Sequence, residues 1–239
     1  MRLDLLARIA LAPLLLVQAL RTRARTPKLP EALGAHTGQT GTGPALRLLL
    51  VGDSTMAGVG SAHLDEALAG QLCARLAPHY TLHWHIHART GATTRATAQS
   101  LPPHPCDMAV VSLGVNDVTS LVPLRRWLAQ TKALITQLRA QGAQAIHLSA
   151  VPPMGRFPAL PQPLAWVLGA QAARMNAALA QMIADEMPDV VLHTLSDLPL
   201  GEGAVARDGY HPGPATYALW AEQVASQILT HKSDNSPAA

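Results

Sequence analysis

The chain has 239 residues, of which 49% are hydrophobic, 14% are charged and only 3% are aromatic. This composition supports one large α/β domain or two small ones with a core of Leu, Ala and Val, and it excludes a largely disordered chain. The formal net charge is +3, and much of the excess lies in Arg21, Arg23, Arg25 and Lys28, so the composition excludes a basic nucleic-acid-binding module.

The first 25 residues differ from the rest of the chain. The apolar run Leu5–Leu20 is interrupted by Arg8 and Pro13, is shorter than the about 20 residues that span a bilayer, and is followed by no signal-peptide cleavage site. The basic residues 21–25 come directly after it. One interpretation is a helix of a cytoplasmic protein that lies peripherally on, or is anchored at, the inner membrane. The other is an ordinary helix that packs on the domain or on a partner subunit.

Residues 26–44 are rich in Pro, Gly and Thr without periodicity, which predicts a linker. We therefore expect the folded domain to comprise residues 45–231. The polar residues 232–239 predict a disordered tail.

Within this domain, apolar strand-like segments alternate with helical patterns. The predicted strands are residues 46–51, 80–87, 108–113, 145–151 and 190–193. Helices are predicted over 61–76 with Ser61 as N-cap, after the turn 89–94, from Pro123, over about 164–183 and from Pro214. Repeated strand–helix units predict an α/β fold whose parallel sheet is covered on both faces.

Two groups of potential metal ligands do not predict a metal site. His83, His85 and His87 alternate with apolar residues, which is typical of the polar face of a half-buried edge strand. Cys73 and Cys106 lie in no metal-binding motif and are expected to be buried free thiols, although a single bridge between them stays open. The sequence predicts neither a metal nor another cofactor.

A candidate nucleophile follows the first strand of the domain. The apolar run 46–51 ends at Gly52-Asp53-Ser54, which places the Ser54 hydroxyl at the carboxyl end of the sheet, where open α/β sheets bind ligands. A serine needs an adjacent base and a group that orients this base. His211 is the candidate base, and Asp208, three residues earlier on the same loop, has the spacing to reach its Nδ1.

Two further residues end neighbouring strands at the same edge. Asn116 follows the strand over 108–113 and can direct its side-chain amide at Ser54, whereas Gly91 follows the strand over 80–87 and can bring its backbone N–H close. Such donors would stabilise an oxyanion.

Four segments of the chain resemble the four blocks of the SGNH (GDSL-type) hydrolase family. They are Gly52-Asp53-Ser54, Gly91, Gly114-Val115-Asn116-Asp117 and Asp208-Gly209-Tyr210-His211. The resemblance implies a flavodoxin-like three-layer α/β/α sandwich with a five-stranded parallel sheet. It also implies ester hydrolysis through an acyl-enzyme. In its terms Ser54 is the nucleophile and first oxyanion donor, Gly91 and Asn116 are the other donors, and Asp208 and His211 complete the triad.

The loop 152–163 follows the fourth predicted strand and borders the same edge. Met154, Phe157 and Leu160 either line an acyl pocket or cap the sheet, and both interpretations stay open. The leading hypothesis is a serine esterase or lipase-like hydrolase that acts on a small acyl-ester or lipid substrate, with thioesterase, lysophospholipase and O-acetylesterase as variants. The alternative is a membrane-associated binding or scaffold protein without turnover. The sequence specifies no oligomeric state.

Overall fold

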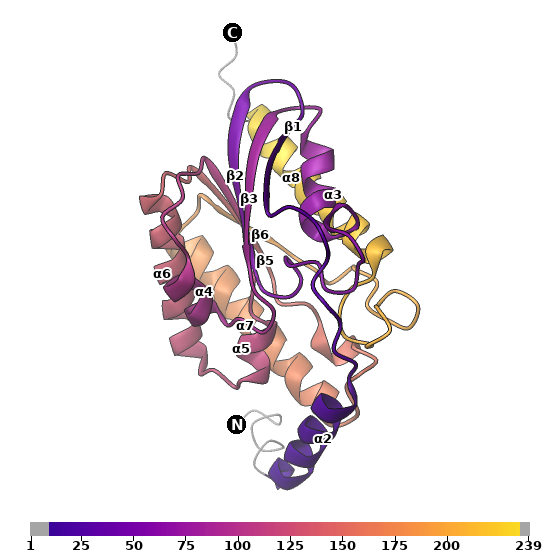
Figure 1. Ribbon diagram of the computed structural model, residues 1–239. Coiled ribbons are helices and arrows are strands. Elements are labelled where there is room, and N and C mark those ends of the chain that lie inside the picture. The colour runs from indigo at the N-terminus through magenta and orange to yellow at the C-terminus, as the bar shows by residue number, and fades with distance from the viewer. Residues whose placement is uncertain (1–9, 235–239) are drawn as a thin grey trace.

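The computed structural model describes residues 10–234, which form an α/β fold around one mixed sheet (Figure 1). The strands are β1 (Thr37–Thr40), β2 (Ala45–Gly52), β3 (Thr81–Ala88), β4 (Met108–Ser112), β5 (Ala145–Ser149) and β6 (Val190–His193). Their order across the sheet is β1-β3-β2-β4-β5-β6. Strands β2 to β6 are parallel, and β1 pairs antiparallel with β3.

Helices cover both faces of this sheet. They are α2 (Ala12–Arg25), α3 (Leu68–Leu76), α4 (Thr94–Ser100), α5 (Val115–Thr119), α6 (Leu124–Ala140), α7 (Leu164–Glu186) and α8 (Pro214–Asp234), with 3-10 turns at Leu64–Glu66 and Met154–Arg156. Figure 1 shows α3 and α8 on one face and α4, α6 and α7 on the other. The predicted three-layer sandwich is thus confirmed.

Strand β2 is the centre of the core. It pairs with β3 on one side and β4 on the other, and Leu48 to Val51 are at most 1% exposed. A strand that is covered on both faces needs apolar residues at successive positions, which explains its unbroken Leu-Leu-Leu-Val run. After β2 the chain adds β3 on one side and then crosses to β4 on the other, so the end of β2 lies at the topological switch point where such folds bind ligands.

The segment 26–44, which we expected to be a linker, contributes a sixth strand. Strand β1 pairs with β3, and Ala32 is buried and donates its N–H to the Ala57 carbonyl at 3.0 Å. All four residues of β1 are exposed, so this strand carries no apolar alternation for a sequence to display. Because β1 covers it, β3 is not the edge strand that its histidines suggested.

The first predicted helix of the domain begins later than expected. Helix α3 starts at Leu68, and its N-cap is Ala67 rather than Ser61. The preceding residues Leu64–Glu66 form a 3-10 turn, and the Ser61 hydroxyl donates to the Glu66 carbonyl at 3.4 Å. The short helix α5 was not predicted, because five residues are too few to show a helical period.

Helices lie near both ends of the described chain. The N-terminal helix lies over Ala12–Arg25, and none of the helices described over residues 10–234 is long and apolar enough to cross a membrane. Helix α8 extends to Asp234, into the expected tail, and residues 235–239 lie outside the described part, as do residues 1–9. Cys73 and Cys106 are buried free thiols, as expected.

Candidate active site

Ser54, His211 and Asp208 form a continuous chain of hydrogen bonds. The Ser54 Oγ lies 2.9 Å from the His211 Nε2, and the His211 Nδ1 lies 2.6 Å from the Asp208 Oδ2. The serine comes from the end of β2, whereas the other two come from the loop before α8, 157 residues later along the chain. The fold therefore joins a hydroxyl, an imidazole and a carboxylate in the order that activates a serine.

The Asp208 carboxylate is fixed by its own loop. Its Oδ1 accepts the backbone N–H groups of Tyr210 at 2.9 Å and of His211 at 3.0 Å, and the residue is only 4% exposed. Burial works against ionisation of Asp208, but the hydrogen bonds from the His211 ring and from these two N–H groups outweigh it and lower its pKa. These hydrogen bonds therefore favour the ionised form of Asp208, and its contact with the His211 Nδ1 turns Nε2 toward Ser54.

A tight turn after β2 presents Ser54. A Cβ on Gly52 would lie 2.5 Å from the Met56 Cβ and 2.8 Å from the Ser112 carbonyl oxygen, so the strand exit has room only for glycine. The turn is closed by the N–H of Val59, which donates to the Ser54 carbonyl at 2.9 Å. The serine side chain is consequently held at the switch point, although it is only 9% exposed.

Asp53 braces this turn and also contacts a second strand end. Its Oδ1 accepts the Thr55 N–H at 3.1 Å, and its Oδ2 accepts the Asn116 Nδ2 at 3.1 Å. Burial raises the pKa of Asp53 to about 6, against the effect of the backbone hydrogen bond from Thr55. The residue thus links the nucleophile turn to the segment after β4 and is no member of the Ser54–His211–Asp208 chain.

Three potential oxyanion donors lie on separate segments. The backbone N–H groups of Ser54 and Gly91 have no hydrogen-bond acceptor among residues 10–234. Gly91 has φ of +79°, which L side chains rarely adopt. The Asn116 amide donates to Asp53 and to the Ala92 carbonyl at 3.0 Å, so it already contacts the segment that carries Gly91.

Asp117 ties two of these segments together, a role that the sequence did not reveal. Its Oδ2 accepts the Thr94 N–H at 3.0 Å and the Thr94 hydroxyl at 2.9 Å, and this hydroxyl accepts the Trp127 Nε1–H at 3.2 Å. Burial raises the pKa of Asp117. Asp117 thereby joins the start of α4, just after Gly91, to α5, which begins beside Asn116.

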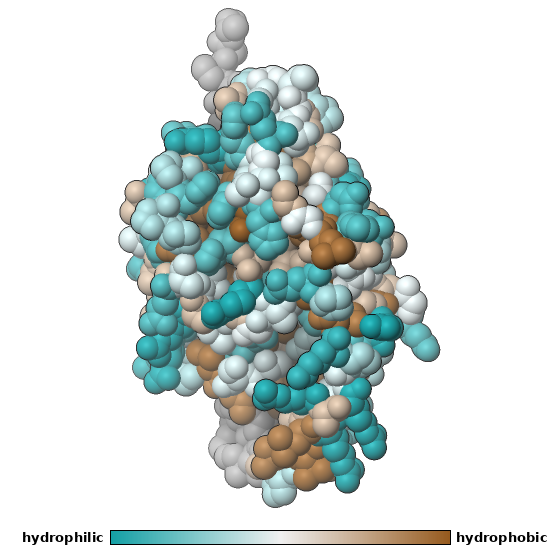
Figure 2. Space-filling model, viewed as in Figure 1, coloured by the Kyte–Doolittle hydropathy of each residue, from teal (hydrophilic) through white to brown (hydrophobic). Residues whose placement is uncertain are grey.

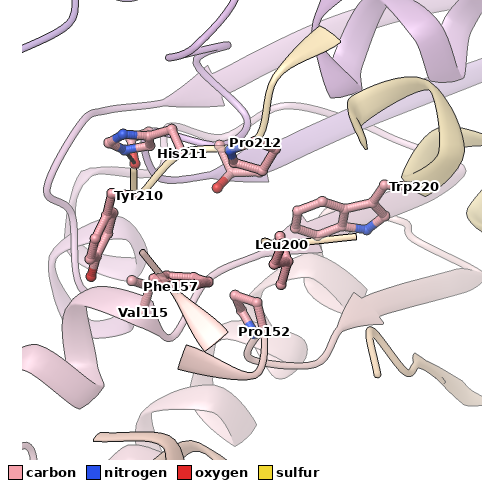
Figure 3. Close-up of a pocket in the computed structure, with 10 residues that line it drawn as sticks. Val115, Pro152, Phe157, Leu200, Tyr210, His211, Pro212 and Trp220 are labelled. Carbon is pink, nitrogen blue, oxygen red and sulfur yellow. Dashed lines mark hydrogen bonds between the residues drawn. The ribbon is translucent and has the colours of Figure 1, made fainter. Parts of the chain in front are cut away.

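A small apolar cavity of about 20 Å³ adjoins Ser54. His211 and Tyr210 lie at one end and Leu200 and Trp220 at the other (Figure 3). The cavity is lined by Ser54, Thr55, Val115, Pro152, Phe157, Leu200, Tyr210, His211, Pro212 and Trp220. Such a volume accommodates about one water molecule, so only a small group enters without movement of the walls.

The three predicted acyl-pocket residues have different surroundings. Phe157 lines the cavity, and its ring meets the edge of Tyr210 with centroids 4.9 Å apart. Met154 is fully buried and Leu160 is 9% exposed, and both pack in the hydrophobic core without lining the cavity. The wall residues Leu200 and Trp220 carry no functional signal in the sequence, whereas Tyr210 stands directly before His211.

The chain is similar to known proteins in sequence and in fold. Residues 50–219 match the model of the GDSL-like Lipase/Acylhydrolase family. A GDSL-like esterase of Mycobacterium tuberculosis is 31% identical over 92% of this chain and 78% of its own. The esterase EstA from Pseudoalteromonas sp. superposes with a TM-score of 0.61 at 17% identity, over 78% of this chain and 98% of its own. A Clostridium thermocellum family 3 carbohydrate esterase gives 0.62 at 17%, over 79% and 98%.

Proposed function

The chain belongs to the GDSL-like lipase/acylhydrolase family, an ester-hydrolysing family, and on that premise we propose that it cleaves carboxylic esters through a covalent acyl-enzyme on Ser54. The observation that carries the proposal is the hydrogen-bonded chain from the Ser54 Oγ through His211 to the buried Asp208. A hydroxyl with a base on one side and an oriented carboxylate behind that base is arranged to attack an acyl carbon.

The reaction proceeds in two halves. The Ser54 Oγ attacks the acyl carbonyl while the His211 Nε2 takes its proton, and the tetrahedral intermediate collapses as His211 returns the proton to the leaving alcohol. Water then attacks the acyl-Ser54 carbonyl and gives a proton to the same imidazole. The second tetrahedral intermediate collapses by cleavage of the bond between the Ser54 Oγ and the acyl carbon, His211 returns the proton to this Oγ, and the carboxylic acid departs. Asp208 stays ionised throughout and stabilises the imidazolium that forms twice.

The negative charge of each intermediate requires donors. The backbone N–H groups of Ser54 and Gly91 are available without breaking any hydrogen bond among the described residues. Asn116 contributes as third donor by turning one amide hydrogen from Asp53 or the Ala92 carbonyl toward the substrate oxygen. The two backbone donors are already oriented and cost little reorganisation when the negative charge develops.

The size of the cavity favours a short acyl group. The ring of Phe157 against Tyr210, together with Leu200, leaves about 20 Å³ beside Ser54. We therefore infer a preference for acetyl and similarly short esters over long-chain ones.

Replacing Phe157 with alanine should shift this preference toward longer chains. Removal of the ring extends the cavity, and kcat/KM for a p-nitrophenyl octanoate relative to the acetate is expected to rise about tenfold. Leu160→Ala is the matched control, because it truncates a buried side chain of the same loop that does not line the cavity. It should lower Tm and leave the ratio unchanged. An unchanged ratio in Phe157→Ala, or an equal shift in Leu160→Ala, rejects the short-acyl inference.

A fluorophosphonate probe separates an enzyme from a scaffold that keeps the fold. The probe reacts with a serine only when a base activates it, so stoichiometric labelling of a peptide that contains Ser54 is expected. Mass spectrometry locates the label. An unlabelled protein, or a label on another serine, would favour the non-catalytic alternative.

A further inference from the structure

The N-terminal helix α2 turns most of its apolar side chains away from the domain. With 3.6 residues per turn, Leu15, Gln18 and Thr22 share one face, and these are the only half-buried residues of the helix. The opposite face carries an exposed stripe of Pro13, Leu16, Val17, Leu20 and Ala24. Leu16 is 61% exposed and Leu20 59%. A surface helix ordinarily buries its apolar stripe against the core, so α2 has the reverse orientation.

Positive charge flanks this stripe. Arg21 lies on one side of it, Arg23 on the other, and Arg25 follows at the end of the helix, whereas α2 contains no acidic residue. Figure 2 shows the brown patch over α2 at the lower end of the molecule, with hydrophilic side chains beside it. An apolar stripe between arginines is typical of helices that lie in a membrane interface, where the charges contact anionic headgroups.

The helix is held against the domain by the face that carries Leu15 and Gln18, and Leu15 packs against the hydrophobic core. The Gln18 Nε2 donates to the Gln162 carbonyl at 2.6 Å, and the Gln18 Oε1 accepts the Leu164 N–H at 3.2 Å. The outward direction of the apolar stripe is therefore set by contacts that the domain itself supplies.

The same end of the molecule carries the site. The loop that precedes α7 leaves the carboxyl end of β5 and supplies Phe157 to the cavity beside Ser54. Helix α5, which carries Asn116, lies at the lower end of the sheet in Figure 1, the end toward α2. A surface that α2 contacts would therefore lie at the end of the sheet where the catalytic residues are.

We propose that α2 docks the protein on the surface of a phospholipid bilayer that contains anionic lipids, with Leu16, Val17 and Leu20 in the headgroup–acyl boundary and the arginines on phosphates. A second copy of the chain is a poorer occupant, because it would bring an equally basic helix against these arginines. The inference goes beyond the proposed function and does not depend on the chemistry of Ser54.

Sedimentation of the full chain with vesicles tests the proposal. Binding to vesicles of phosphatidylcholine plus phosphatidylglycerol is expected to exceed binding to phosphatidylcholine alone by about tenfold, and high salt should remove most of the difference. The Ser54→Ala variant should bind like the wild type, so that failure of docking and failure of the catalytic proposal are distinguishable.

Two sets of variants separate the apolar and the charged contributions. Leu16→Gln/Leu20→Gln should lower the partition coefficient by about tenfold or more. Arg21→Gln/Arg23→Gln/Arg25→Gln should abolish the preference for anionic vesicles. The control Leu219→Gln changes an equally apolar side chain, 50% exposed on α8, and should bind like the wild type. Unchanged circular dichroism and Tm show that each variant is folded.

Three results would overturn the proposal. The first is wild-type protein that does not sediment with anionic vesicles. The second is equal loss of binding in Leu219→Gln. The third is a wild-type dimer in light scattering that the Leu16→Gln/Leu20→Gln variant does not form, together with the absence of vesicle binding by either protein. This result would assign the stripe to a contact with a second copy of the chain.

Discussion

Replacing Ser54 with alanine is expected to lower kcat for p-nitrophenyl acetate by about 10⁵–10⁶-fold, because the acyl-enzyme cannot form and the oxyanion donors and binding alone then remain. The residual activity should show no burst phase, and the variant should not react with the fluorophosphonate probe. The loss belongs to kcat rather than to KM, since the hydroxyl is needed for the chemical step.

Ser61 offers the matched control for this variant. It is 9% exposed, like Ser54, and its hydroxyl donates to the Glu66 carbonyl rather than to an imidazole. The Ser61→Ala variant should lose some stability and keep its activity. Substantial turnover by Ser54→Ala, or a comparable loss in Ser61→Ala, would contradict the assignment of Ser54 as nucleophile.

The second large effect is expected at Asp208. The Asp208 Oδ2 lies 2.6 Å from the His211 Nδ1. Replacement of Asp208 by asparagine keeps the shape of the side chain but removes the negative charge that keeps the proton on Nδ1, so kcat should fall by about 10³–10⁴-fold. Steady-state kinetics measures the loss, and circular dichroism verifies the fold.

The control for this charge removal is Asp107→Asn. The Asp107 carboxylate pairs with Arg47 at 2.5 Å in an exposed ion pair, so its loss should change neither kcat nor, by more than about 1 kcal/mol, the stability. A kcat of Asp208→Asn within tenfold of the wild type would mean that the imidazole is oriented without the carboxylate.

The parallel sheet and the contacts among Ser54, His211 and Asp208 were predictable from the sequence. The unbroken apolar run of β2 is what a strand covered on both faces requires, and its abrupt end at Gly52-Asp53-Ser54 marks a strand exit. Asp208 and His211 lie three residues apart on one loop, so their spacing in the sequence predicts the contact between their side chains. The pairing of His211 with Ser54 followed from the rule that the carboxyl ends of parallel strands meet at one edge.

Features that depend on tertiary contacts had no such signature. Asp117 was indistinguishable from a turn residue until the fold brought Thr94 to it from 23 residues away. The cavity walls Leu200 and Trp220 are apolar residues of a loop and a helix, and nothing in their spacing separates a wall from the core. The outward stripe of α2 was equally hidden, because an apolar helix pattern does not state which side the domain occupies.

Strand β1 shields part of the edge of β3 from other molecules. It pairs along the edge of β3 with two threonines, a glutamine and a glycine, all of them exposed. The glycine is Gly38, where a Cβ would come within 2.6 Å of the Trp84 ring. Without β1, the eight residues Thr81–Ala88 would present an open backbone edge, a template for pairing with other molecules. A chain trimmed to residue 45 would keep Ser54, Asp208 and His211, and it is expected to aggregate more readily because the edge of β3 would be open.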